Sequence, residues 1–219
     1  MGLAHFSLQQ NARDQLAVSL REAQAVAVII AVPTLAAVAA AAEPVTLLLL
    51  GEKWTPVSVL MLGPLLASYL LIRRMFVTTA LRVIGLSSAS LVSSMVEGVA
   101  VLVALVIAGR ISPVAVTVIN PFGVMIGFLP LIYLLAREFQ LSGAQQLALI
   151  GRDLAFGLAA FALGRQAITL VPFESLFIDT IVAGSTAFVV AATLLIWSDV
   201  KLVKALLGDV FRKPAGLEQ

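Results

Sequence analysis

Six apolar stretches, each long enough to cross a bilayer, follow one another along the 219-residue chain. A helix needs about 20 residues to span ~30 Å of hydrocarbon, and the longest uncharged run, residues 111–136, has 26. Only 12% of the residues are charged, whereas a soluble domain has roughly 25%. The sequence therefore predicts an all-α, polytopic membrane protein. Its predicted transmembrane helices are 23–42, 55–72, 88–108, 113–136, 154–172 and 177–197.

The loops between these spans alternate between many and few cations. Of the 14 Lys and Arg residues, eleven fall on one side, and only Lys53, Arg110 and Arg165 fall on the other. Because loop cations are retained in the cytoplasm during insertion, both ends are predicted to be cytoplasmic. They form an amphipathic leader (1–22) and a tail (198–219) around the membrane domain (23–197). The fifth span requires Arg165 to reach the outer interface, with the Arg152-Asp153 pair marking its inner boundary.

Several function classes lack the residues that they need. The chain has no cysteine and a single histidine, His5, so neither a metal site nor a Ser/His/acid triad is expected. It also has no Walker loop and no GxGxxG following a strand, which excludes ATP-driven transport by this chain alone. The cations lie at span ends without interleaved aromatics, so nucleic acid is not an expected partner. We expect a protein that is not an enzyme and that has no cofactor and no catalytic residue.

One acid, Glu97, lies near the centre of a span. An ionised carboxylate at that depth costs about 2.5 to 3.5 kcal/mol, so it should face protein or water. Ser87, Ser90, Ser94 and Glu97 are spaced three, four and three residues apart, which places them on one helical face. This polar stripe is either a hydrogen-bonded seam between helices or the wall of a hydrated cavity open to the cytoplasm. The functional hypothesis is that this stripe forms the wall of the hydrated cavity.

Prolines interrupt the predicted spans at Pro33, Pro64, Pro121 and Pro130. Each removes a backbone donor, so kinks are expected where neighbouring groups satisfy the freed carbonyls. Asn120-Pro121 is the candidate hinge, because a polar side chain lies beside the break. Gly123 and Gly127 form a GxxxG pattern on the same span, which predicts close helix packing.

The passage from Ala42 to Trp54 reads Ala-Glu-Pro-Val-Thr-Leu-Leu-Leu-Leu-Gly-Glu-Lys-Trp. It resembles the apolar run ending in Gly-Glu-Lys-Trp of polysaccharide-biosynthesis membrane proteins of the oligosaccharidyl-lipid flippase type, which are relatives of the multidrug and toxin extrusion transporters. The leader from Phe6 to Arg21 is similar to the central cytoplasmic loop of that family. The run Arg82-Val83-Ile84-Gly85 is similar to the family's loop before the next helix.

The resemblance implies the C-terminal half of such a transporter, because family members have about twice as many helices in two bundles around a central cavity. The implied function is to move an undecaprenyl-diphosphate-linked glycan across a bacterial inner membrane, with a second six-helix bundle or a homo-oligomer as partner. Glu97, Ser94, Ser90, Ser87 and Asn120 are then candidates for the cavity wall, and Pro121 for the hinge. The candidate diphosphate contacts at the inner mouth are Arg73, Arg74 and Arg82.

Two alternatives remain open at this point. The chain could be half of a drug or ion antiporter of the same superfamily, which would need several acids converging within the membrane. It could instead be a non-transporting assembly subunit or a truncated fragment.

Overall fold

The computed structural model describes the backbone of residues 2–170 and 175–199, and side chains from Arg13 onward within those ranges. That part of the chain is helical and contains no strand. Six helical segments are long and apolar enough to cross a membrane, when η1, α2 and α3 are taken together. The prediction of an all-α membrane protein is confirmed. The elements are α1 (Gly2–Leu50), η1 (Glu52–Trp54), α2 (Thr55–Leu60), α3 (Leu62–Val83), α4 (Ser87–Ala108), α5 (Pro113–Phe139), α6 (Gly143–Leu170) and α7 (Leu176–Ser198).

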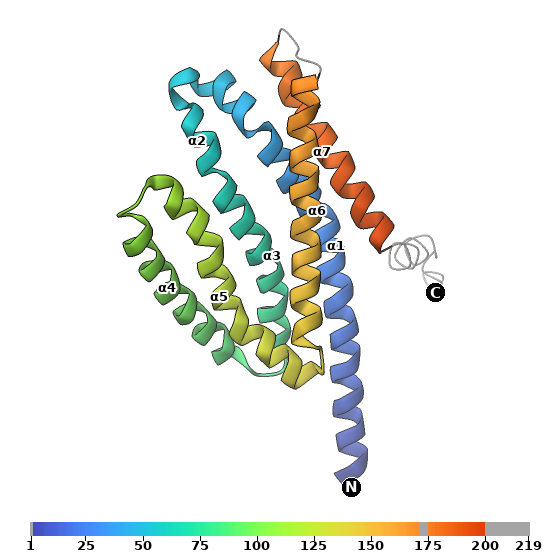
Figure 1. Ribbon diagram of the computed structural model, residues 1–219. Helices are drawn as coiled ribbons and strands as arrows, with labels where there is room; N and C mark the ends of the chain where they lie inside the picture. Colours follow the sequence, from blue (N-terminus) through green and yellow to red (C-terminus); the bar gives the residue numbers. More distant parts are fainter. Residues whose placement is uncertain (1, 171–174, 200–219) are drawn as a thin grey trace, which may run out of the picture.

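Helix α1 is much longer than the predicted span 23–42. Its 49 residues measure about 74 Å at 1.5 Å per residue, more than twice the hydrocarbon thickness, and its N-terminal part projects from the bundle (Figure 1). The leader and the first span form one helix, because no strong helix breaker separates them. The helix continues past residue 42 to Leu50, through Pro44, and Glu43 in this part binds Arg165 of α6. It ends at Gly51, whose φ of +84° suits glycine.

The other membrane helices follow the predicted order with shifted ends. The second span is divided at Met61 into α2 and α3, because Pro64 has no N–H for the carbonyl of Leu60. In contrast, α5 continues through Pro121 and Pro130, so the hinge at Asn120-Pro121 stays a prediction. Most of the predicted tail, residues 200–219, lies outside the described residues.

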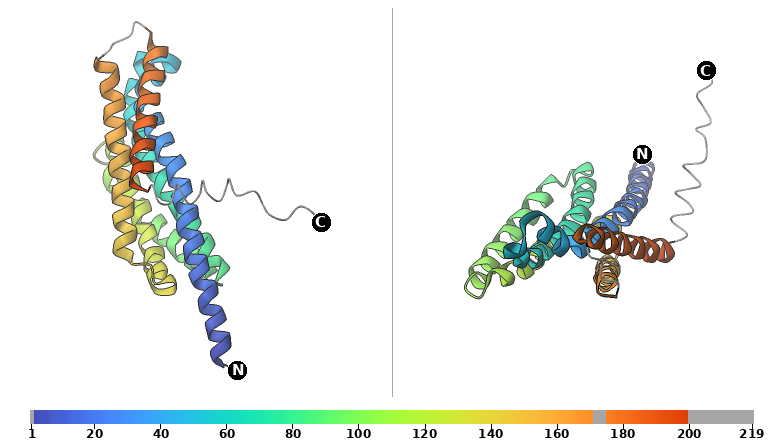
Figure 2. Two further views of the ribbon diagram at one scale, coloured as in Figure 1. Left: turned by 90° about the vertical axis from the view of Figure 1, so that its right-hand side faces the viewer. Right: turned by 90° about the horizontal axis from the view of Figure 1, so that it is seen from above.

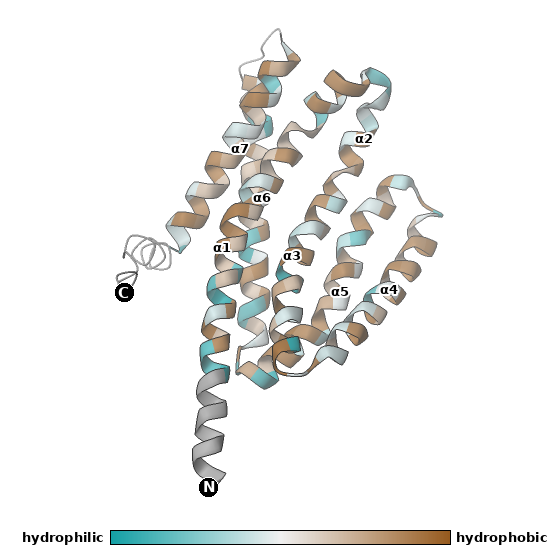
Figure 3. Cartoon of the chain, turned by 180° about the vertical axis from the view of Figure 1, so that it is seen from behind, coloured by the Kyte–Doolittle hydropathy of each residue, from teal (hydrophilic) through white to brown (hydrophobic). Residues whose placement is uncertain are grey.

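The helices form two groups joined by α3. On one side α4 packs against α5, and on the other α1 packs against both α6 and α7, while α3 contacts α5 and α1 (Figure 1). Viewed from above, the bundle is elongated, with α4 and α5 at one end (Figure 2). Apolar residues predominate along the membrane helices, and hydrophilic residues occur mainly on lower α1, on α6 and at some turns (Figure 3). Large apolar side chains are exposed on each of these helices. This distribution suits a protein surrounded by lipid.

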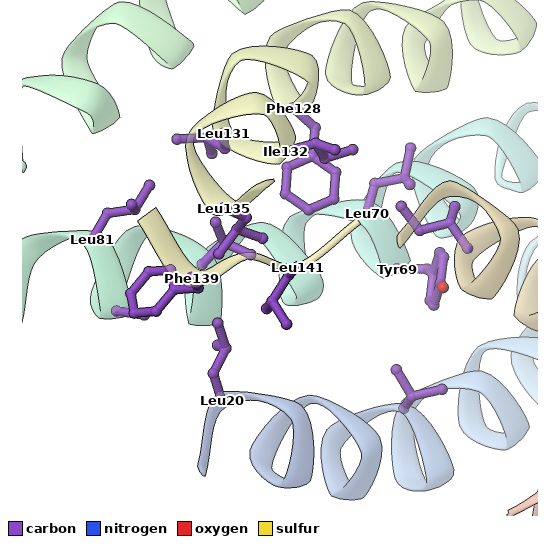
Figure 4. Packing of buried hydrophobic residues seen from close by; sticks show 14 of the residues in the cluster. Leu20, Tyr69, Leu70, Leu81, Phe128, Leu131, Ile132, Leu135, Phe139 and Leu141 are labelled. Carbon is purple, nitrogen blue, oxygen red and sulfur yellow. The ribbon is translucent and has the colours of Figure 1, made fainter. Parts of the chain in front are cut away.

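Large apolar side chains fill the lower part of the space between α1, α3 and α5. Leu20 of α1 points toward Leu135, Phe139 and Leu141 (Figure 4). The contacts between α1, α6 and α7 are instead made by small residues, which let the helix backbones approach closely. This second cluster consists of Ala36, Ala40, Ala160, Ala183, Ala187 and Ala191.

Glycines bring α4 and α5 into close contact, as the GxxxG pattern predicts. A Cβ atom built on Gly127 would lie 2.4 Å from Cβ of Glu97, and one built on Gly123 would lie 2.6 Å from Cγ2 of Val101. Ser93, which is fully buried, donates a hydrogen bond to the carbonyl of Gly127 (2.6 Å). The position of Glu97 is therefore fixed by close packing of its own backbone against α5.

We expect Gly127→Ala to destabilise the bundle by about 1–3 kcal/mol, because the added methyl group must push α4 away from α5. The matched control is Gly98→Ala on α4, where a Cβ atom would meet nothing within 4 Å. Thermal unfolding of the two purified variants in detergent provides the measurement. Equal melting temperatures would contradict the close contact between α4 and α5.

Candidate functional site

Two neighbouring arginines near the middle of α3 face different partners. Successive residues of an α-helix are rotated by about 100°, so Arg73 is directed to α6 and Arg74 to α4. Both side chains are largely buried, with relative exposures of 5% and 10%. Each guanidinium forms an ion pair with a carboxylate, Asp153 for Arg73 and Glu97 for Arg74. Each of these two largely buried arginines is thus neutralised by a carboxylate of another helix.

On the α4 side, three of the four residues of the predicted polar stripe contact arginines of α3. Arg74 binds Glu97 through Nη1 and donates from Nη2 to Oγ of Ser94 (2.9 Å). Closer to the predicted cytoplasmic end, Arg82 donates to Oγ of Ser90 (3.1 Å). We call these five residues the α3–α4 seam. It extends from the turn between the two helices to the middle of α4.

Three of the other candidate residues lie apart from these contacts. Ser87 is exposed at the first residue of α4, while Asn120 and Pro121 are half-buried on α5. Among the described residues, the hydrogen bonds of the α3–α4 seam involve none of them. The structure therefore joins Arg74 and Arg82 to Glu97, Ser94 and Ser90, and separates them from Arg73.

The pair on the α6 side belongs to a larger network. Asp153 is fully buried, and its Oδ2 atom accepts hydrogen bonds from Arg73 and from the hydroxyl of Tyr69 (2.9 Å). Arg73 also donates from Nε to the Tyr69 hydroxyl (2.6 Å). Arg152 binds Oδ1 of Asp153 and also binds Asp199, just after α7 (2.9 Å). This buried network ties α3, α6 and the end of α7 together.

The sequence predicts that Arg152 and Asp153 mark the inner boundary of the fifth span, and this position relative to the membrane stays a prediction. Helix α6 begins ten residues before Asp153, at Gly143, so the pair lies well inside the helix. A buried carboxylate is stable there because two arginines and a tyrosine hydroxyl bind it. The signal in the sequence was present, since buried acids require cations, but the spacing of 80 residues between Arg73 and Asp153 hid their contact.

A hollow of about 530 Å³ adjoins this network on the predicted cytoplasmic side. The sequence did not predict this hollow, because its lining comes from α1, α3, α6 and the residue after α7, which are far apart in the chain. On α1 the lining residues lie in the leader and in the N-terminal third of the first predicted span. We call it the basic hollow. Its lining includes Arg21, Gln24, Ala25, Val28, Ile29, Arg73, Gln145, Gln146, Ala148, Leu149, Arg152 and Asp199.

The part of the chain that the structure describes contains no group of three His, Asp or Glu residues that could hold a metal ion. The chemistry of both regions is therefore that of arginine, carboxylate, hydroxyl and amide groups. Such groups bind polar or charged molecules by ion pairs and hydrogen bonds.

The beginning of the chain is similar to a known family. Residues 1–58 match the model of the family described as polysaccharide biosynthesis protein. This match supports the resemblance to polysaccharide biosynthesis proteins. It covers α1, η1 and the start of α2, including Arg21 and Gln24 of the basic hollow. No curated protein and no solved structure matches the chain.

We expect Asp153→Asn to destabilise the protein by about 3–5 kcal/mol, because it leaves the buried guanidinium of Arg73 without its counter-charge. Replacing both partners, in Arg73→Met with Asp153→Leu, should restore part of the loss, because no unpaired charge remains. Denaturant unfolding in detergent measures both effects. The matched control is Glu52→Gln, at an exposed residue of η1. An Asp153→Asn variant as stable as the wild type would show that the network contributes little.

Proposed function

We propose that this chain is one bundle of a flippase that moves a lipid-linked oligosaccharide between the leaflets of a bacterial inner membrane. The match of residues 1–58 to polysaccharide biosynthesis proteins supports the substrate class. The six membrane-spanning segments support a transport role. The proposed activity is movement of the lipid without covalent chemistry.

The observation that carries the proposal is the position of the α3–α4 seam. Helix α4 lies at the edge of the bundle (Figure 1), and of the six spans it has the smallest buried share. Yet Ser94 on this helix is exposed and the Glu97 side chain keeps 20% exposure near mid-membrane. Polar groups facing hydrocarbon are costly. A second bundle with a hydrated cavity between the two would explain why polar groups occur on this face.

The distribution of charge along the α3–α4 seam suits a phosphate-containing headgroup. Arg74 is neutralised by Glu97, whereas Arg82 bonds only to a serine hydroxyl among the described residues. Arg82 therefore retains a full positive charge near the cytoplasmic end of the seam. Of the three arginines that the sequence suggests as diphosphate contacts, Arg82 fits this role best. The lipid tail would remain in the bilayer during transfer.

Alternating access gives the second bundle a necessary role. In two-bundle transporters, one repeat rocks against the other around a site near mid-membrane. Glu97, which binds Arg74 and keeps 20% of its side chain exposed, is the titratable group that the sequence predicts near that depth. We therefore propose that Glu97 faces the cavity in at least one state of the transport cycle.

The test is a gene deletion with complementation. In the organism that carries the gene, deletion should trap lipid-linked oligosaccharide in the inner leaflet, and the wild-type gene should restore its transfer. We expect Glu97→Gln to reduce transfer about tenfold, because Arg74 loses its counter-charge. Glu97→Asp should retain more activity, and the exposed Glu52→Gln serves as the matched control.

Two results would contradict the proposal. Full transfer by a stably folded Glu97→Gln variant would remove the charge-dependent role of Glu97. Unchanged polysaccharide export in the deletion strain, together with lost drug or cation efflux, would favour an antiporter of the same superfamily. Melting temperatures of the variants separate loss of transport from loss of folding.

A further inference from the structure

Three hollows follow one another between α1, α3 and α6. On α1 their lining residues recur every three or four positions from Arg21 to Glu43, which defines one face of the helix. This distance is about 33 Å at 1.5 Å per residue, close to the hydrocarbon thickness. The basic hollow lies at the predicted cytoplasmic end, and a hollow beside the Glu43–Arg165 pair lies at the other end. The three hollows therefore form a line across the membrane domain.

The middle hollow, of about 130 Å³, is apolar except where it meets the buried network. Tyr69 and Asp153 line it at that end, and Arg73 lines the basic hollow on the other side of the same contacts. We call it the apolar hollow. The rest of its lining is Val32, Leu35, Ala36, Ala39, Leu62, Leu65, Leu66, Leu154, Gly157, Leu158 and Phe161.

The basic hollow presents hydrogen-bond donors that lack partners. Gln24 is 5% exposed, and its Nε2 atom is buried with no hydrogen-bond partner. A buried amide left in this state costs about 1–3 kcal/mol, so its presence calls for a ligand that can accept its hydrogen bond. Arg21, on the same helix face, has no ion pair or hydrogen bond among the described residues. Within the described part of the chain, neither group has an acceptor.

The electrostatics of the hollow favour an anion of low charge. Arg21, Arg73 and Arg152 contribute three positive charges, and Asp153 and Asp199 offset two of them. In addition, Gln145 and Gln146 belong to the first turn of α6, where the helix dipole is positive. One net positive charge remains, and a single negative charge balances it. A phosphodiester carries one negative charge, whereas a diphosphate carries more.

We propose that the basic hollow and the apolar hollow together bind one anionic phospholipid of the phosphatidylglycerol type. Its phosphodiester accepts hydrogen bonds from Arg21 and from Nε2 of Gln24, and one of its hydrocarbon chains enters the apolar hollow beyond Tyr69. Basic pockets between membrane helices on the cytoplasmic side are a known setting for anionic lipid headgroups. The site lies entirely within one bundle, so it depends neither on a second bundle nor on the proposed flippase activity.

The binding test uses the purified full chain in detergent and native mass spectrometry with added lipids. Dioleoyl phosphatidylglycerol should bind with higher affinity than dioleoyl phosphatidylcholine, whose headgroup has no net charge. We expect Arg21→Gln and Gln24→Leu each to weaken binding of phosphatidylglycerol about tenfold, because each removes a hydrogen bond to a charged group. The matched controls are Arg110→Gln and Gln166→Leu, at exposed residues outside the hollow. Arg21 is exposed, so its variant should fold even if the Gln24 variant does not.

A second pair of variants tests the hydrocarbon chain. Gly157 lines the apolar hollow, and a Cβ atom there would make only an ordinary contact, 3.4 Å from Cγ1 of Val32. Gly157→Leu should therefore fill the hollow and weaken lipid binding, whereas Gly98→Leu, in open space on α4, should not. Inorganic phosphate should not compete with the lipid. Competition by inorganic phosphate at equal concentration would show that the apolar hollow takes no part.

Other outcomes would overturn the assignment. Equal binding of phosphatidylglycerol and phosphatidylcholine, or unchanged binding by a folded Arg21→Gln variant, would remove the anionic lipid site. Displacement of phosphatidylglycerol by equimolar undecaprenyl diphosphate would show that the hollow prefers a diphosphate. Because every measurement here is of lipid binding, a failed flippase test would leave the lipid-binding result unaffected. Equally, a failed lipid-binding test would leave the flippase result unaffected.

Discussion

The bundle depends on the need to neutralise charge inside a membrane. An unpaired arginine or carboxylate inside a membrane is costly. Removing one partner of a buried ion pair leaves the other as an unpaired buried charge, which destabilises the fold. Arg73 and Arg74 meet this need in different directions, with Asp153 of α6 and with Glu97 of α4. Two adjacent residues on α3 therefore connect helices at both ends of the elongated bundle. The remaining helices pack around these contacts.

The two pairs have different surroundings, and this difference separates their roles. Asp153 is fully buried and shares its oxygens among Tyr69, Arg73 and Arg152, and its network lies between the basic hollow and the apolar hollow. Glu97 lies at the edge of the bundle and keeps part of its surface exposed. The first arrangement holds helices in place, whereas in the proposed two-bundle transporter the second would change partners when the other bundle or the substrate approaches. A rigid interior beside an adaptable edge suits a bundle that moves as a unit.

Helix packing supports the same division. The buried residues between α1, α6 and α7 are alanines. Gly164 also lies in this interface, where a Cβ atom built on it would be 3.0 Å from Cβ of Ala40. Between α4 and α5, Gly123 and Gly127 perform the corresponding role. Small residues allow close backbone approach, and lipid provides no hydrophobic driving force between helices. Van der Waals contact and the ion pairs therefore provide most of the cohesion among the described helices.

The sequence by itself determined the helical class, the order of the spans and the face shared by Ser90, Ser94 and Glu97, because hydrocarbon thickness and helical periodicity are local properties. It also identified the close contact at Gly127. It did not reveal that Glu43 binds Arg165 or that Arg73 binds Asp153. Only the tertiary structure decided which charges pair, because the partners are distant in the sequence, as in the Glu43–Arg165 pair, whose residues are 122 positions apart. It also revealed the basic hollow, whose lining residues come from helices that are distant in the sequence.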